Sequence, residues 1–266
     1  QTILDDGSRL QSQLNLDDWG TYQLACALGP IYNPAMRAND RVVFSIFLMN
    51  QLGYMTRICR SGSSLYPMLA FKNDIVNTTT VTVDKKVSYA IINAARTHLP
   101  TIESCRVDFK GANKKIDLAL RSFPRISGTS ECRTLQRFFD QELTVSYSPE
   151  LNAYLSTYPC TDWKVYGQAP MEEHILQELK SKLAVGYEGK TPYQAVNYLL
   201  HFVQCAFDYK TDDENYGYEK WNFAEETIAS NFSDCDDRAV LFAQLVRNLL
   251  HMDVVLVEYP GIHLAT

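Results

Sequence analysis

The sequence is organised around Phe232–Phe242, which reads FSDCDDRAVLF. Ser233 is a favourable N-cap, Asp236 three residues later completes a pattern like a capping box, and apolar residues follow at helical spacing. The pattern predicts a helix with Cys235 in its first turn. Unpaired backbone N–H groups and the positive end of the helix dipole favour a thiolate there, the form that attacks carbonyl carbon. Cys235 is therefore a candidate nucleophile.

Length, composition and charge exclude several classes of protein. The chain has 266 residues, 46% hydrophobic and 21% charged, which is ordinary for a soluble globular protein. Its net charge of -6 and pI of 5.4 argue against a nucleic-acid partner. No apolar run approaches the roughly 20 residues of a membrane helix, so we expect no transmembrane segment. The start at Gln1, without initiator Met or leader, suits a mature or trimmed chain.

The seven cysteines form no CxxC pair, which argues against a zinc ribbon or a thioredoxin-type site. Three disulfides with Cys235 left free would suit a secreted, periplasmic or cell-surface enzyme, the location we expect. Several buried free thiols would suit a chain of this size equally well. No cluster of histidines and carboxylates indicates a metal, and nothing indicates a cofactor.

Hydrophobic periodicity and turn residues divide the chain into three parts: residues 1–75, 76–165 and 166–266. In the first part, helices open at Asp17 and Asn39, and Gly53 ends the second helix. A hairpin with strands at 55–59 and 65–71 follows. This part reads as helices and then a hairpin.

The second part reads as a β-rich middle domain without visible chemistry. Strands are predicted at 78–83 and 143–147, and an apolar, Ala-rich stretch at 87–97 is predicted as a helix. A loop containing glycine joins 105–109 to 116–120 in a predicted hairpin.

The third part carries the candidate chemistry. Two helices, at 171–183 and 192–207, precede an acidic, tyrosine-rich loop at 208–218, which is either solvated or in contact with substrate. The Cys235 helix and a strand at 253–259 follow. His263 then begins a returning strand, which the chain can bring back to the helix start. A thiol nucleophile needs a base, and imidazole suits that role near neutral pH, so His263 is the candidate.

An internal repeat relates the first and third parts. Asp237-Arg238 aligns with Asp40-Arg41 at an offset of 197 residues, with the same helix, turn and strand order. At that offset Cys235 falls on Ala38 and His263 falls on Tyr66. The N-terminal copy thus keeps the scaffold and lacks the nucleophile and the base. The alternative is a chance match between two amphipathic helices.

The run Asp234–Ala239, then Leu245–Arg247 and Tyr259–Gly261 with His263, resembles the catalytic core of transglutaminase-like cysteine enzymes, which have a papain-like Cys-His-Asp triad. It is similar to bacterial transglutaminase-domain proteins over about Met171–Thr266. The resemblance implies an α+β fold with a Cys helix packed on an antiparallel sheet. It also implies Cys235 as nucleophile, His263 as base and a peptide or protein amide as substrate. Water would complete hydrolysis of the thioester, or a lysine amine would complete cross-linking; we expect hydrolysis.

Two departures from the family pattern stand out. The third triad member, an Asp or Asn, comes from a strand after the histidine, and the sequence ends three residues after His263. Either the strands that follow are left out of this chain, or the orienting residue comes from elsewhere. The glycine that ends the Cys helix is replaced by Leu250, although Gly53 holds the matching place in the N-terminal copy. A non-catalytic binding or scaffold protein is therefore the competing class.

The neighbouring residues have alternative roles. Asp236 and Asp237 oppose an activated thiolate, because nearby carboxylates raise its pKa, and Arg238 offsets one of them or forms a structural pair with Asp237. Tyr218 and Trp221 are candidate substrate-binding residues, with aromatic packing as the alternative. The remaining histidines are predicted to be a packed core residue, at His201, and surface or element-end residues, at His98, His174 and His251.

Overall fold

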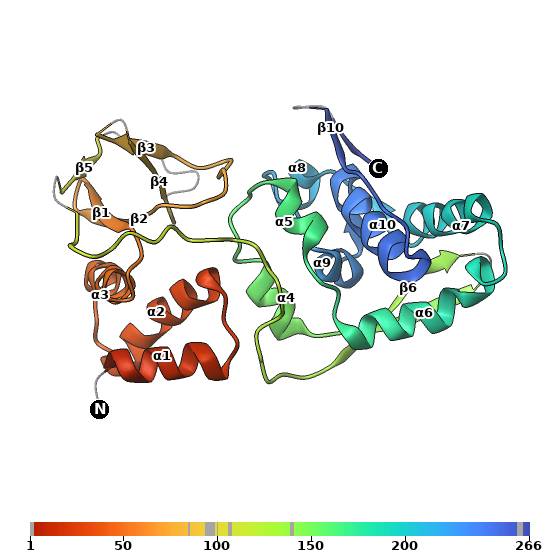
Figure 1. Cartoon of the computed structure of the whole chain (residues 1–266), viewed down its shortest axis with the longest axis horizontal. Helices are drawn as coiled ribbons and strands as arrows, with labels where there is room; N and C mark the ends of the chain where they lie inside the picture. Colours follow the sequence, from red (N-terminus) through yellow and green to blue (C-terminus); the bar gives the residue numbers. More distant parts are fainter. Residues whose placement is uncertain are drawn as a thin grey trace. The chain divides into compact units, whose positions relative to one another are not determined.

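The computed structural model describes residues 3–84, 86–93, 99, 101–105, 108–138, 141–259 and 263–266. These residues form ten helices and a five-stranded antiparallel sheet with three small two-stranded pairings, which confirms the α+β class (Figure 1). The chain divides into two compact units. Unit 1 comprises Gln1–Arg125 with Pro159–Asp162, and unit 2 comprises Ile126–Tyr158 with Trp163–Thr266.

Unit 1 begins with three helices: α1 Ile3–Gln13, α2 Asp18–Tyr32 and α3 Ala38–Gln51. The Asp17 side chain caps α2 by accepting a hydrogen bond from the Gly20 N–H at 2.7 Å, as its sequence position predicts. Gly53 follows α3 with φ +87°, a conformation that costs glycine little, so the predicted helix stop is confirmed. Trp19 and Tyr22 of α2 and Met49 of α3 are buried in the core of this unit.

The sheet of unit 1 has the order β3-β4-β2-β1-β5, formed by β1 Thr56–Ser61, β2 Ser64–Leu69, β3 Thr80–Val83, β4 Val87–Ile91 and β5 Glu103–Ser104. The predicted β1–β2 hairpin is confirmed. The helix predicted at 87–97 is wrong where the structure describes it, because Val87–Ile91 pairs with β2 and β3 and buries Tyr89 and Ile91. Residues 94–98 lie outside the described residues.

The hairpin predicted between 105–109 and 116–120 does not form among the described residues. Ile116 instead bridges Phe71, and Lys114 bridges Tyr54, both in parallel. This pairing buries Ile116 and Leu118 fully, which a solvent-facing hairpin would not do. The structure does not describe residues 106 and 107. It does not describe His98 either. Unit 1 joins strands from both sides of the predicted boundary at residue 75, because pairing across the sheet ignores sequence order.

Unit 2 contains seven helices and three strand pairings among its described residues. The helices are α4 Pro149–Leu155, α5 Trp163–Gln168, α6 Glu173–Tyr187, α7 Pro192–Cys205, α8 Asp212–Asn215, α9 Ala224–Ala229 and α10 Cys235–Leu250. The pairings are antiparallel β6 Glu131–Phe138 with β7 Gln141–Tyr147, parallel β8 Asp208–Tyr209 with β9 Phe232–Ser233, and antiparallel β10 Val257–Tyr259 with β11 His263–Ala265. The predicted helices at 171–183 and 192–207 are confirmed as α6 and α7.

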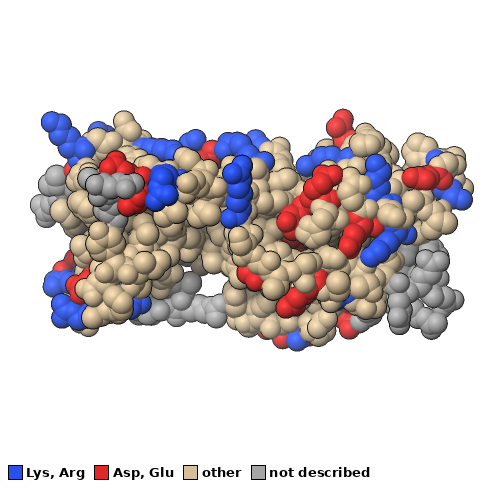
Figure 2. Space-filling model, turned by 90° about the horizontal axis from the view of Figure 1, so that it is seen from below, with Lys and Arg blue, Asp and Glu red and all other residues tan. Residues whose placement is uncertain are grey.

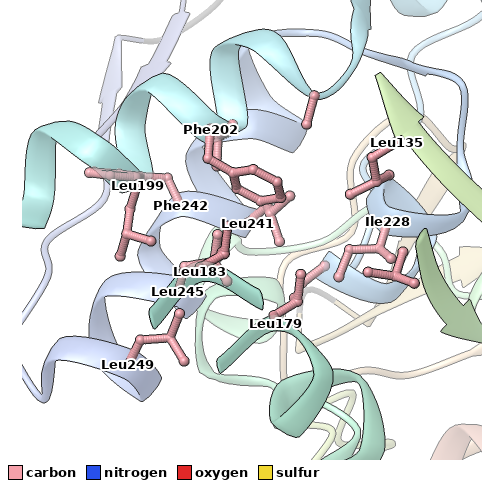
Figure 3. Close-up of a cluster of buried hydrophobic side chains, with 14 of the residues drawn as sticks. Leu135, Leu179, Leu183, Leu199, Phe202, Ile228, Leu241, Phe242, Leu245 and Leu249 are labelled. Atoms are coloured by element: carbon pink, nitrogen blue, oxygen red, sulfur yellow. The ribbon is translucent and has the colours of Figure 1, made fainter. Parts of the chain in front are cut away.

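Helix α10 passes through the core of unit 2 (Figure 3). Its Leu241, Leu245 and Leu249 recur every four residues, which places them on one helix face. That face packs against buried side chains of α6, α7, α9 and β6: Leu179, Leu183, Leu199, Phe202, Ile228 and Leu135. Because the core fixes α10, it also fixes the position of the helix start that carries Cys235.

The end of α10 does not require a glycine at Leu250. His251 follows Leu250 with φ 54° and ψ 38°, the left-handed conformation that usually favours glycine at this place. His251 is exposed, as predicted for an element-end residue. The strand predicted at 253–259 is shorter in the structure, because only Val257–Tyr259 pairs with β11.

Candidate active site

The start of α10 differs by one residue from the prediction. Asp234, not Ser233, is the N-cap, and its Oδ1 accepts hydrogen bonds from the N–H groups of Asp236 at 3.1 Å and Asp237 at 3.2 Å. Ser233 belongs to β9, whose parallel pairing with β8 keeps it extended, so no Ser233–Asp236 capping box forms. Cys235 is the first helical residue, within the first turn as predicted.

The Cys235 thiol is half-buried and donates a hydrogen bond to Asp236 Oδ1, with Sγ and Oδ1 3.3 Å apart. Burial, the negative charge of Asp236 and this hydrogen bond together raise the pKa of Cys235 to about 12. The charge of Asp234 acts in the same direction. The helix start alone would favour a thiolate, but burial and the two carboxylates outweigh it, so the resting thiol is protonated.

Asp236 also holds the strand that carries His263. Its Oδ1 accepts a hydrogen bond from the Leu264 N–H at 3.1 Å, so β11 lies against the start of α10. Burial raises the pKa of Asp236, and the Coulomb interaction with His263 opposes that rise. His263 itself is exposed. In the part of the chain described, the thiol makes no hydrogen bond with the His263 ring, because it is directed to Asp236.

Arg238 and Asp237 bind separate partners. Arg238 Nε donates to Ser233 Oγ at 2.9 Å and its Nη2 donates to Phe207 O at 2.8 Å, which ties α10 to β9 and the end of α7. Asp237 is 3% exposed and its Oδ2 accepts from Asn222 Nδ2 at 3.0 Å. Arg238 therefore supports the scaffold, and the predicted Asp237–Arg238 pair is replaced by bonds to other residues.

Two hydrogen bonds at the start of α3 have counterparts at the start of α10, at the positions that the predicted repeat aligns. Arg41 Nε donates to Met36 O at 2.9 Å, and Met36 aligns with Ser233 at the offset of 197 residues. Asn39, which aligns with Asp236, accepts from the Leu65 N–H at 3.0 Å, as Asp236 does from Leu264. In both units, the second residue of the helix thus holds the second strand of the following hairpin.

These matching bonds also refine the alignment. Leu65 and Leu264 are 199 residues apart, so by contact His263 corresponds to Ser64 rather than to Tyr66. The shift of two residues accompanies a difference in helix length, because α10 has 16 residues and ends at Leu250, whereas α3 has 14 and ends at Gln51. Neither Ser64 nor Tyr66 carries an imidazole, so the N-terminal copy lacks the base in either alignment.

The predicted substrate-binding aromatics have different surroundings. Trp221 stacks on Trp163 with ring centroids 3.8 Å apart, and its Nε1 donates to Glu219 Oε1 at 3.1 Å. The charge of Glu219 contributes to the raised pKa of Asp236, after burial, which places Glu219 beside the site. Tyr218 lies 5.9 Å from the Tyr216 ring, centroid to centroid. Trp221 thus combines aromatic packing with a link to the site.

Several residues of the site have no clear signal in the sequence. Asp212 falls in the acidic loop but is only 5% exposed, and its Oδ2 accepts from the Lys220 N–H at 2.6 Å. Burial raises the pKa of Asp212 to about 7. Lys220 Nζ in turn lies 2.8 Å from Glu226 Oε1, and both side chains are largely buried. The burial follows from long-range packing, which a local acidic pattern does not reveal.

Two other histidine predictions have clear outcomes. His201 is exposed, so its predicted core position is wrong; it lies on the outer side of α7, and Cys205 Sγ is 3.6 Å from its Nδ1. His174 is partly exposed, 3.5 Å from Glu172 Oε2, as expected for a surface residue.

No family model, curated protein or solved structure matches the chain. The transglutaminase-like family therefore stays a prediction from the motif.

All seven cysteines are free in this structure, so it contains none of the three disulfides considered from the sequence. Among the described side chains, none form a group of three or more His, Cys, Asp or Glu placed to hold a metal ion. None of the helices described here is long and apolar enough to span a bilayer. On the face drawn in Figure 2, acidic and basic side chains are interspersed.

Proposed function

We propose that the chain catalyses thiol-dependent acyl transfer on peptide or isopeptide amides, with Cys235 as nucleophile and His263 as base. The observation that best supports this is the Leu264–Asp236 hydrogen bond, because it holds the His263 strand against the helix end that carries the thiol. Covalent catalysis by a thiol requires a base within reach of the nucleophile, and a base on an element packed beside the thiol supports that pairing. Because the family is not established by relatives, this proposal rests on the site and the motif.

The resting thiol must be redirected before it reacts. With a pKa of about 12, only about one thiol in 10⁵ is ionised at pH 7. When the Cys235 side chain rotates away from Asp236, the His263 imidazole replaces the carboxylate as the acceptor of the thiol proton. Sulfur then attacks the amide carbon, the C–N bond breaks, and the imidazolium returns its proton to the leaving amine. Water attacks the resulting thioester and gives a proton to His263, the C–S bond breaks to release the carboxylic acid, and His263 passes the proton to the departing sulfur, which restores the thiol.

A binding or scaffold protein is the second candidate, and the Cys235–Asp236 hydrogen bond favours it because that bond keeps the thiol protonated. Cross-linking to a lysine amine is a further outcome of the same thioester. Hydrolysis remains our preference, since the sequence offers no regulated calcium site.

Alkylation by iodoacetamide at pH 7, resolved by mass spectrometry of each cysteine peptide, tests the pairing. We expect His263→Ala to slow modification of Cys235 at least about tenfold, because the base is removed. Cys205 beside His201 is the matched internal control, and its rate should not change. Equal Cys235 rates in both chains would favour the binding protein.

A further inference from the structure

A cavity of about 570 Å³ opens in unit 1 at the start of α3. Its lining comes from α2, α3, β2 and the segment after β4, and includes Arg37, Ala38 and Arg41. Ala38 aligns with Cys235 in the repeat, so the cavity lies where the C-terminal copy has its thiol. The N-terminal copy lacks the nucleophile but has space and two guanidinium groups at that place.

Counting only the lining residues that the structure describes, the guanidinium groups give the cavity mouth one net positive charge. Arg37 Nε lies 3.0 Å from Asp40 Oδ2, which neutralises one of them. Arg41 is held by its Nε, which donates to Met36 O at 2.9 Å. Within the described residues the terminal nitrogens of Arg41 have no ion-pair partner. They are left as two parallel donors, the geometry that matches a carboxylate bidentately.

The start of α3 adds to this preference for an anion. The N-cap of α3 is Arg37, which makes no side-chain capping hydrogen bond, whereas Asp234 makes two at the start of α10. Replacing a capping acid by Arg reverses the charge at this position. The first N–H groups of α3 therefore lack the carboxylate that satisfies those of α10.

The rest of the cavity is suited to the apolar body of a ligand. Pro30, Met36, Val42 and Pro67 supply its apolar walls. Cys26, also in the lining, is hydrogen-bonded with Tyr22 and Ser45, and burial raises the pKa of its thiol. The lining thus combines one open positive charge with neutral surfaces. A phosphate dianion would leave a second charge unpaired here, whereas a carboxylate would not.

We propose that this cavity in unit 1 binds a carboxylate, carried by a peptide C-terminus or by an acidic side chain. The cavity would then be a recognition site derived from the same scaffold as the Cys235 site. This inference does not depend on the proposed catalytic function, because none of its residues contributes to the chemistry of Cys235.

Titration of the full chain by isothermal calorimetry tests the proposal, with acetyl-Ala-Ala as the C-terminal carboxylate probe and acetyl-Glu-amide as the side-chain probe. We expect saturable binding of at least one acid and binding at least about tenfold weaker for acetyl-Ala-Ala-amide. The tighter acid identifies the source of the carboxylate. Failure of both acids to bind at millimolar concentration, or equal binding of acid and amide, would overturn the proposal.

Variants locate the site. Arg41→Gln should weaken binding of the acid at least about tenfold, and Ala38→Leu, which keeps both arginines but fills the cavity, should do the same. Arg60→Gln is the matched control, because Arg60 is exposed in the same unit and lies on β1, where it pairs with Glu103 of β5. Cys235→Ser should leave binding unchanged, so failure of catalysis and failure of this site are separable. Full binding by a folded Ala38→Leu chain would contradict the placement.

Discussion

Asp236→Asn isolates the charge that suppresses the thiol at the start of α10. The carboxylate accepts from Cys235 Sγ at 3.3 Å and from the Leu264 N–H at 3.1 Å. An asparagine oxygen keeps the second bond, as Asn39 does for Leu65 in unit 1. The substitution therefore removes a negative charge while leaving β11 attached to the helix.

The size of the effect follows from the contact. A charged neighbour within about 4–6 Å shifts a pKa by about 1–3 units. Because Cys235 is half-buried and partly screened by solvent, we expect the substitution to lower the pKa of Cys235 by about 1–2. A lower pKa also reduces the nucleophilicity of the thiolate, with a Brønsted slope of about 0.4–0.5. The net expectation is alkylation of Cys235 about 3- to 15-fold faster at fixed pH.

The assay is the initial rate of iodoacetamide labelling at pH 7, followed on the Cys235 peptide. Asp213→Asn is the matched control, since Asp213 is an exposed acid of helix α8 and its substitution makes the same change in net charge. Its Cys235 rate should equal that of the native chain. A rate in Asp236→Asn within about twofold of the native rate, with the fold intact by circular dichroism, would refute the electrostatic reasoning.

Three further substitutions test the scaffold by chemical denaturation. Leu245→Ala should lower the free energy of unfolding by about 2–5 kcal/mol, because Leu245 is fully buried in the unit 2 core; a loss below about 1 kcal/mol would contradict that packing. His251→Gly should raise it by about 0.5–1 kcal/mol by relieving the left-handed conformation, whereas a decrease would argue against that strain. The pKa of Asp212 is raised by burial to about 7, so its protonated form stabilises the fold. The contribution of protonated Asp212 to the free energy of unfolding is fully present below about pH 4 and is lost as pH rises to about 7. Asp212→Asn should therefore reduce the decrease in the free energy of unfolding over this pH range. An unchanged dependence on pH would contradict this effect of Asp212.

The helices of unit 2 could be predicted because their apolar residues recur at helical spacing and pack on one core. Leu241, Leu245 and Leu249 carry that pattern in α10. The helix starts one residue later than capping preferences predict, because pairing with β8 holds Ser233 extended. This pairing joins Asp208 and Phe232, which are 24 residues apart in the sequence. Capping preferences depend on residues that are close in the sequence, so they do not predict such a pairing.

The strand partners in unit 1 could not be predicted from local patterns. The Ala-rich stretch after Val87 has helical character, yet its first residues complete a sheet with β2 and β3. Residues near Ile116 pair with Phe71 because that arrangement buries their side chains. Thr161 likewise bridges Ile75, which returns a short segment to unit 1 and places the unit boundaries away from those expected from sequence order.

At the candidate site, sequence spacing brought Cys235 and the His263 strand to the same helix end. It did not reveal that Asp236 would bind both the thiol and β11, because that depends on side-chain orientation. The buried position of Asp212 and the contact between Trp163 and Trp221 were also invisible, since each joins segments that pack only in the folded chain.

The most direct test of the central claim is the Cys235 alkylation rate at pH 7 in four chains: native, Asp236→Asn, His263→Ala and the double variant. If Asp236 and His263 compete for the thiol, the acceleration caused by Asp236→Asn should require His263. We predict that the double variant reacts at least about tenfold more slowly than Asp236→Asn alone. Equal rates for Asp236→Asn and the double variant would contradict a Cys235–His263 pair.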